Sequence, residues 1–222
     1  MQRADQIACL VLPMLLSLLL ACADRNTDNP LLPLLLGNQP IEENRVVLVI
    51  GDSLTEYSDG FHLANLLGPQ FHVYHRGVGN RDFPYWTVRL NAALQTATEA
   101  PADHIVVALG TNDAFQADPT GFIQDVYAFH RTLRGYSQAR VYYLLVPETG
   151  IASLQPAIRN NNARLALEVP TDNTVLVDIQ SAFESAPDAA LLYSIDDPLH
   201  PTERGYALMG DLIQQAVREH QY

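Results

Sequence analysis

Three side chains of this chain could together form an activated nucleophile. Ser53 lies in the turn-prone quartet Gly-Asp-Ser-Leu at 51–54, directly after an apolar run. A serine hydroxyl is a weak nucleophile until a neighbouring base removes its proton, and His200 is the candidate base. Asp197 precedes that histidine in Asp-Asp-Pro-Leu-His at 196–200 and can orient its other ring nitrogen. These residue types indicate acyl transfer through a serine.

Hydrogen-bond donors near such a serine would stabilise the oxyanion that forms when it attacks a carbonyl group. Asn112, in Gly-Thr-Asn-Asp at 110–113, can offer its side-chain amide. Backbone N–H groups of Ser53 and around Gly79, in Gly-Val-Gly-Asn at 77–80, can complete an oxyanion hole. The Thr-Asn-Asp stretch is also typical of a helix cap, which would be a purely structural role.

Two kinds of apolar pattern alternate along the chain, and they predict the strands and helices that must position these residues. Short runs rich in Val, Ile and Tyr have the continuous hydrophobicity of buried parallel strands. Segments with apolar residues at helical spacing separate them, and the last runs from Thr202 to about His220. The pattern predicts a doubly wound parallel sheet with helices on both faces. Its strands are expected at Arg45 to Ile50, Phe71 to His75, His104 to Leu109, Arg140 to Val146 and Thr174 to Asp178.

The polar segments with possible chemistry all follow predicted strands. In doubly wound sheets, ligands bind outside the carboxyl ends of the strands, which share one rim. The segments that reach this rim are 51–54, 77–80, 110–113 and 196–200. We therefore expect Ser53, Asn112 and His200 to meet there.

The four segments, in this order, resemble the four sequence blocks of the SGNH or GDSL hydrolase family. The resemblance covers essentially Val46 to the C-terminus. It implies a flavodoxin-like three-layer α/β/α sandwich with a five-stranded parallel sheet, over residues 45–222, and hydrolysis of carboxylic esters without a metal or an organic cofactor. It also implies the role of each site residue: nucleophile Ser53, base His200, orienting acid Asp197 and oxyanion donor Asn112.

The second block departs from the family pattern. The family usually places its donor at a glycine five residues after an asparagine that ends the second strand. Counted from His75, that position is Asn80, and Gly79 comes just before it. Because the family uses a backbone N–H here, and because Asn tolerates left-handed backbone angles, both Gly79 and Asn80 are candidates for the second oxyanion donor.

Composition excludes several other kinds of chemistry. The net charge of -12 argues against a nucleic-acid partner, which would need clustered positive charge. All 13 basic residues are arginine, so lysine-based dyads, Schiff bases and P-loops are absent. The two cysteines, Cys9 and Cys22, both lie near the N-terminus, which leaves residues 45–222 without a thiolate nucleophile or a cysteine metal site.

The N-terminus has the layout of a secretory signal. Arg3 precedes an apolar stretch from Ile7 to Leu20, which is too short to span a bilayer comfortably. Leu-Leu-Ala-Cys, ending at Cys22, resembles a bacterial lipobox, so we expect a signal peptide at 1–21, lipidation of Cys22 and a tether at 22–44. The protein would then be anchored in the bacterial cell envelope. An ordinary signal peptide with an incidental cysteine is the alternative.

The substrate stays open at this point, and so does one non-enzymatic alternative. A small-molecule or lipid ester fits an esterase, while an acetylated glycan fits a carbohydrate O-deacetylase with the same catalytic residues. The altered second block leaves a non-catalytic surface binding lipoprotein as a more distant possibility. A flavodoxin-type cofactor binder is disfavoured, because it leaves the serine, asparagine and Asp-His pair without a role.

Other side chains near the predicted rim have simpler interpretations. Asp52 is expected as a helix cap, and Asp196 as a solvated neighbour of Asp197. His72 and His75 point to opposite faces of a strand, which makes a poor metal chelate. Core packing is the default expectation for the nearby aromatic residues Tyr57, Phe83, Tyr85, Trp86 and Phe115.

Overall fold

The computed structural model describes residues 44–97 and 100–220. The expected signal peptide at 1–21, the lipidation site Cys22 and all but the last residue of the expected tether at 22–44 lie outside the described residues. Among the described helices, none combines the length and the apolar character that crossing a bilayer requires.

A five-stranded parallel sheet forms the centre of the fold, in the strand order β2-β1-β3-β4-β5. Its inner strands are buried on both faces, as their continuous Val and Ile content predicts. The observed ends differ from the predicted ones by at most two residues, the largest difference being the extension of the second strand to Gly77. The strands are β1 Arg45–Gly51, β2 Phe71–Gly77, β3 His104–Ala108, β4 Arg140–Leu145 and β5 Thr174–Asp178.

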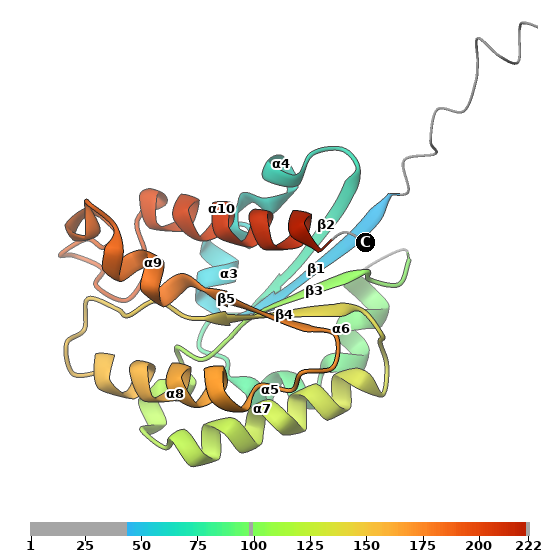
Figure 1. Ribbon diagram of the computed structural model, residues 1–222, viewed down its shortest axis with the longest axis horizontal. Helices are drawn as coiled ribbons and strands as arrows, with labels where there is room; N and C mark the ends of the chain where they lie inside the picture. Colours follow the sequence, from blue (N-terminus) through green and yellow to red (C-terminus); the bar gives the residue numbers. More distant parts are fainter. Residues whose placement is uncertain (1–43, 98–99, 221–222) are drawn as a thin grey trace, which may run out of the picture. The chain divides into compact units, whose positions relative to one another are not determined.

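Helices cover both faces of the sheet, which confirms the predicted three-layer α/β/α sandwich (Figure 1). One layer packs its apolar side chains against Leu48, Ile105 and Tyr143. It contains α5 Phe83–Thr87, α6 Leu90–Ala97, α7 Pro119–Arg134 and α8 Gln155–Glu168. The opposite layer packs against Val47 and Val106. It contains α3 Ser53–Tyr57, α4 Leu63–Leu67, α9 Ile179–Ser185 and α10 Glu203–Glu219, together with the short 3-10 turn η1 Gly60–His62.

The strand order places a topological switch point beside β1. The chain leaves β1 toward β2 on one side, while β3 lies on its other side. In doubly wound sheets, ligands bind at the carboxyl ends of such a pair of strands. Two further 3-10 turns lie in the connections: η2 Asp113–Gln116 follows β3, and η3 Ala189–Leu191 lies in the long connection between α9 and α10. The predicted segments with possible chemistry therefore converge on this rim.

Two glycines allow helix α3 to start directly against the sheet. A Cβ atom on Gly51 would overlap the side chain of Thr55. A Cβ atom on Gly77 would overlap the backbone of Glu56. The close approach of the β1 and β2 ends to α3 sets the position of Ser53, the first residue of that helix.

Candidate active site

Ser53 sits at the start of α3, where the backbone is fixed by Asp52. The Asp52 side chain accepts a hydrogen bond from the backbone N–H of Leu54 at 2.9 Å, which makes it the N-cap of the helix, as predicted. The N–H of Ser53 itself heads the helix and so has no acceptor within it. The Ser53 hydroxyl and a backbone N–H without an acceptor in the helix thus belong to the same residue.

Ser53, His200 and Asp197 form a continuous hydrogen-bonded chain, although Ser53 is 147 positions from His200 in sequence. The Ser53 Oγ atom lies 2.9 Å from His200 Nε2, and His200 Nδ1 lies 2.8 Å from Asp197 Oδ2. Among the contacts of the described residues, none joins Asp196 to that histidine. The sequence prediction that these three side chains meet, with Asp197 in place of its neighbour, agrees with this geometry.

The loop before α10 folds tightly around the Asp197 carboxylate. Its Oδ1 atom accepts hydrogen bonds from the backbone N–H groups of Leu199 and His200, both at 3.1 Å. Burial alone would raise the pKa of Asp197, but the hydrogen bonds from the backbone and the ring of His200 outweigh this and hold the pKa below its ordinary value. The carboxylate therefore stays ionised and can hold a proton on His200 Nδ1.

Asn112 links the site to Asp52 and to the loop after β2. Its side-chain Nδ2 donates to Asp52 Oδ2 at 3.1 Å and to the carbonyl oxygen of Arg81 at 3.0 Å. It occupies the N-cap position of η2 but makes no side-chain capping bond there. Asn112 therefore stands at a cap position, as the helix-cap alternative expects, but its side-chain amide does not cap the turn and is directed into the rim.

The loop after β2 comes close to Ser53 at Gly79. A Cβ atom on Gly79 would lie 3.8 Å from Ser53 Cβ and 3.0 Å from Glu56 Oε2. The Gly79 N–H donates to Glu56 Oε2 at 2.8 Å, and the next residue, Asn80, has a left-handed backbone with φ of 59°. Sequence reasoning missed Glu56, whose spacing three residues after Ser53 puts both on one helix face.

Two aromatic residues expected in the core instead lie on the surface of the rim. Tyr57 is 60% exposed and Phe115 is 58% exposed, so the prediction of core packing is wrong for both. In the same short elements, Leu54 of α3 and Ala114 of η2 are buried, which leaves the exposed positions to the two rings. The Tyr57 ring packs against the imidazole of His200, with ring centroids 4.7 Å apart.

The aromatic residues of α5 are packed as predicted. Phe83 and Trp86 are buried in the core, and Tyr85 is partly buried beside them. The Trp86 Nε1–H also donates to the carbonyl oxygen of Gly51 at 3.1 Å, a contact that the sequence pattern did not reveal. Because Gly51 ends β1, this bond ties α5 to the strand end that leads to Ser53.

Two buried carboxyl groups lie beneath the site. Burial raises the pKa of Asp52 and that of Asp113 to about 7. Asp113 accepts a hydrogen bond from the Phe83 N–H on one oxygen, while its buried Oδ2 has no partner among the described residues. Sequence reasoning did not single out Asp113, because burial depends on the tertiary fold.

Replacing Asp113 with asparagine is expected to change how stability depends on pH. Burial raises the folded-state pKa of Asp113 from 3.8 to about 7, so the folded chain keeps a proton that the unfolded chain releases. Its stabilising contribution is full below about pH 4 and is lost as the pH rises through about 7. The free energy of unfolding of Asp113→Asn, relative to the parent, should therefore increase by about 2 kcal/mol between pH 5 and pH 8. Urea unfolding at both pH values tests this, and parallel pH dependence of the two proteins would contradict it.

Histidines outside the catalytic rim are engaged in other contacts or exposed. His75 Nε2 lies 2.8 Å from Asp59 Oδ1, and His72 is exposed on the same strand. Within the part of the chain that the structure describes, no cluster of three or more His, Cys, Asp or Glu side chains is arranged to hold a metal ion.

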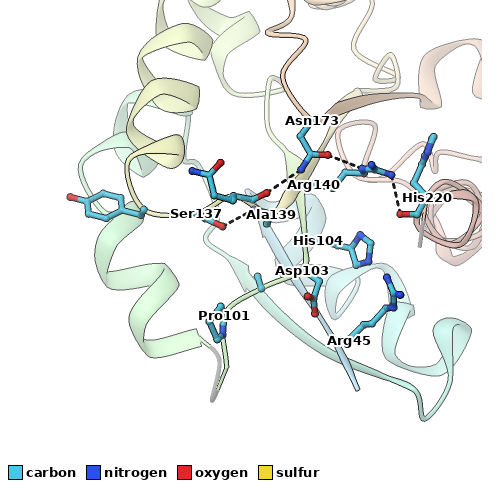
Figure 2. A pocket seen from close by; sticks show the side chains of 12 residues that line it. Arg45, Pro101, Asp103, His104, Ser137, Ala139, Arg140, Asn173 and His220 are labelled. Carbon is cyan, nitrogen blue, oxygen red and sulfur yellow. Dashed lines mark hydrogen bonds between the residues drawn. The ribbon is translucent and has the colours of Figure 1, made fainter. Parts of the chain in front are cut away.

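A cavity of about 450 Å³ lies at the opposite end of the sheet from Ser53, beside the amino ends of β1, β3 and β4 (Figure 2). Arg140 on its wall donates to Asn173 Oδ1 at 2.9 Å and to the carbonyl oxygen of His220 at 3.0 Å. His104 nearby is buried, and burial lowers its pKa to about 4. These groups join strand ends to the end of α10 and are separate from the catalytic rim.

Comparison with known proteins places this geometry in context. A sequence model of the GDSL-like lipase/acylhydrolase family matches residues 49–208. No curated protein gives a significant match to the chain.

Solved structures share the fold at low sequence identity. A member of the lipolytic G-D-S-L family from Veillonella parvula is 20% identical, with a TM-score of 0.67, over 78% of this chain and 98% of that one. A GDSL-like lipase from Bacteroides thetaiotaomicron is 17% identical, with a TM-score of 0.65, over 83% and 93% of the two chains. A carbohydrate esterase of family 3 from Talaromyces cellulolyticus is 16% identical, with a TM-score of 0.60, over 79% and 97%.

Proposed function

Because the chain belongs to the GDSL-like lipase/acylhydrolase family, we propose that this serine hydrolase cleaves carboxylic esters through Ser53, His200 and Asp197. The observation that carries the proposal is the hydrogen-bonded chain from Ser53 Oγ through the imidazole of His200 to the Asp197 carboxylate. Nucleophile, base and orienting acid are each within reach of the next, which is the arrangement that acyl transfer through a serine requires.

In the first step, Ser53 Oγ attacks the carbonyl carbon of the ester while His200 Nε2 takes the hydroxyl proton. The tetrahedral intermediate collapses when His200 returns this proton to the leaving alcohol, which leaves the acyl group esterified to Ser53. Asp197 keeps the other proton of the ring on Nδ1, so that Nε2 is free to accept.

In the second step, water replaces the alcohol. His200 Nε2 takes a proton from the water as its oxygen attacks the acyl carbon, and then returns the proton to Ser53 Oγ as the acid departs. Both steps pass through an oxyanion, so the same donors serve twice.

The oxyanion donors we propose are the Ser53 N–H, the Asn112 amide and a backbone N–H of the loop after β2. Asn112 donates its amide hydrogens to Asp52 and to the Arg81 carbonyl oxygen. A substrate oxyanion would replace the Arg81 oxygen as acceptor, since the bond to Asp52 keeps the amide plane in place. Each donor is expected to contribute about 10² to 10³ in kcat.

The exposure of the site favours short acyl groups or ester groups carried on larger molecules. Asp197 has a side chain that is 52% exposed, and Tyr57 presents its ring to solvent next to His200. Acetyl groups on sugars are a second candidate class, because an exposed tyrosine ring is a flat face on which a sugar can stack. The similar fold of a carbohydrate esterase supports testing that class.

A substrate panel tests the proposal and separates the two classes. The full-length protein is assayed on p-nitrophenyl esters from acetate to palmitate and on acetylated xylan. We expect the highest kcat/KM on the shortest acyl chains, because the exposed rim offers little apolar surface for a long one. Acetate release from xylan that exceeds that from simple acetates would make the O-deacetylase the better description. No hydrolysis of any member would contradict the proposal.

We also propose that the protein is anchored in a bacterial envelope through a lipid on Cys22. The lipobox-like Leu-Leu-Ala-Cys at 19–22 and the short apolar stretch before it support this. Incorporation of labelled palmitate that is lost in Cys22→Ala would support the anchor, and unchanged labelling would contradict it.

A further inference from the structure

Glu56 makes a contact beside the nucleophile that ester hydrolysis does not by itself require. It lies one helical turn after Ser53 on α3 and reaches across to the loop after β2. Its Oε2 atom accepts the backbone N–H of Gly79 at 2.8 Å. A carboxylate oxygen therefore already accepts a hydrogen bond from one of the two backbone N–H groups that the sequence indicated as oxyanion donors.

The backbone N–H groups of this loop can be accounted for one by one. The Val78 N–H donates to the carbonyl oxygen of Gly51 at 3.2 Å, and that of Gly79 donates to Glu56. The next N–H, of Asn80, has no partner among the described residues. Gly79 and Asn80 form a turn, and Asn80 has a φ of 59°, so successive N–H groups can face one concave side that accepts an anion.

Without Glu56, few contacts would fix this turn. Gly77 and Gly79 lie within three residues, and glycine backbones lose the most conformational freedom on ordering. On the far side, the carbonyl oxygen of Arg81 is held by Asn112, which the reaction itself would engage. The hydrogen bond from the Gly79 N–H to the Glu56 side chain is therefore the main restraint on the turn between the Val78 hydrogen bond and Asn112.

We infer that Glu56 is a positioning residue: its carboxylate takes the Gly79 N–H and holds the turn so that the Asn80 N–H serves as the second backbone oxyanion donor. This inference rests on the proposed ester hydrolysis. The opposite arrangement, in which Gly79 is the donor and Glu56 merely blocks it, predicts the opposite sign, because removing a blocking carboxylate would speed the reaction.

Three full-length variants test the inference: Glu56→Ala, Glu56→Gln and, as a matched control, Glu203→Ala. Glu203 is an exposed glutamate in the first turn of α10, so its loss removes a similar surface charge near the site. kcat and KM are measured on p-nitrophenyl acetate, and the rate of Ser53 labelling by a fluorophosphonate is measured separately. Thermal unfolding of each variant shows that the fold is retained.

For Glu56→Ala we expect kcat about tenfold lower with KM within about twofold, since only part of one donor's contribution is lost and only in the transition state. Labelling should slow by a similar factor. Glu56→Gln, whose amide oxygen can still accept the Gly79 N–H, should restore parent values, and Glu203→Ala should match the parent.

Each alternative outcome overturns the inference in a recognisable way. Equal or faster hydrolysis and labelling by Glu56→Ala would show that Glu56 does not position the turn. A fall of the same size in Glu56→Gln would show that charge, and not acceptance of the N–H, matters. A parent that neither hydrolyses esters nor labels at Ser53 would overturn the proposed function itself, and the inference with it.

Discussion

Ser53→Ala is expected to lower kcat for ester hydrolysis by about 10⁴ or more while the fold stays intact. The substitution removes the Oγ atom that lies 2.9 Å from His200 Nε2, and with it the site of acylation. Backbone geometry should be unaffected, because the start of α3 is fixed by the Asp52 cap and by close contacts of Gly51 and Gly77.

The measurement is kcat on p-nitrophenyl acetate, together with thermal unfolding of both proteins. Ser185→Ala is a matched control, since Ser185 is exposed on α9 and takes no part in the rim. It should match the parent. If Ser53→Ala kept more than a few per cent of the activity, another residue would be the nucleophile.

Asp197→Asn is expected to lower kcat by about 10³ to 10⁴, because it stabilises the His200 tautomer that carries its proton on Nε2. The Asp197 Oδ1 atom accepts two backbone N–H groups, so the asparagine should keep its carbonyl oxygen there. Its NH₂ group then faces His200 Nδ1, which can only accept from it. The ring proton moves to Nε2 and points at Ser53, where a free lone pair is needed.

The matched control for this prediction is Asp196→Asn. This change removes the neighbouring charge in the same loop, without a contact to His200 among the described residues. It should leave kcat within about twofold of the parent, because an exposed charge interacts weakly through water. Equal losses in both variants would point to loop charge, and a loss below tenfold in Asp197→Asn would contradict a role in holding the tautomer.

The sheet could be predicted closely because its inner strands are buried on both faces. Apart from their first and last residues, β1 and β3 consist of Val, Ile and Leu, and such continuous apolar runs are typical of buried parallel strands. The glycines after β1 and β2 then indicated where the chain turns. Since parallel strands share one rim at their carboxyl ends, Ser53 and Asn112, which follow β1 and β3, could be expected to meet there. His200 follows β5 only after α9 and η3, so its expected place at the rim depended also on the resemblance to the four sequence blocks.

Contacts across the rim could not be predicted in the same way. The Glu56 carboxylate on Gly79 and the burial of Asp113 depend on distances between segments that only the folded chain sets. Tyr57 was wrongly expected in the core because its apolar character does not show that Leu54 and Thr55 take the buried positions of α3, while the Tyr57 ring lies against His200.

The choice between Gly79 and Asn80 as the second oxyanion donor needs the structure as well as the spacing in the sequence. Spacing within the second block pointed to Asn80, while residue type pointed to Gly79. In the structure the Gly79 N–H is already bound by Glu56, and the left-handed angle falls on Asn80. Asn80 is therefore favoured both by its spacing from His75 and by the hydrogen bond that engages the Gly79 N–H.

Mass spectrometry of the full-length protein after reaction with a fluorophosphonate tests the central claim most directly. We expect one adduct, on the peptide that contains Ser53, absent from Ser53→Ala and formed far more slowly in His200→Ala. An ester-hydrolysing parent without this adduct, or with the adduct on another residue, would contradict the claim.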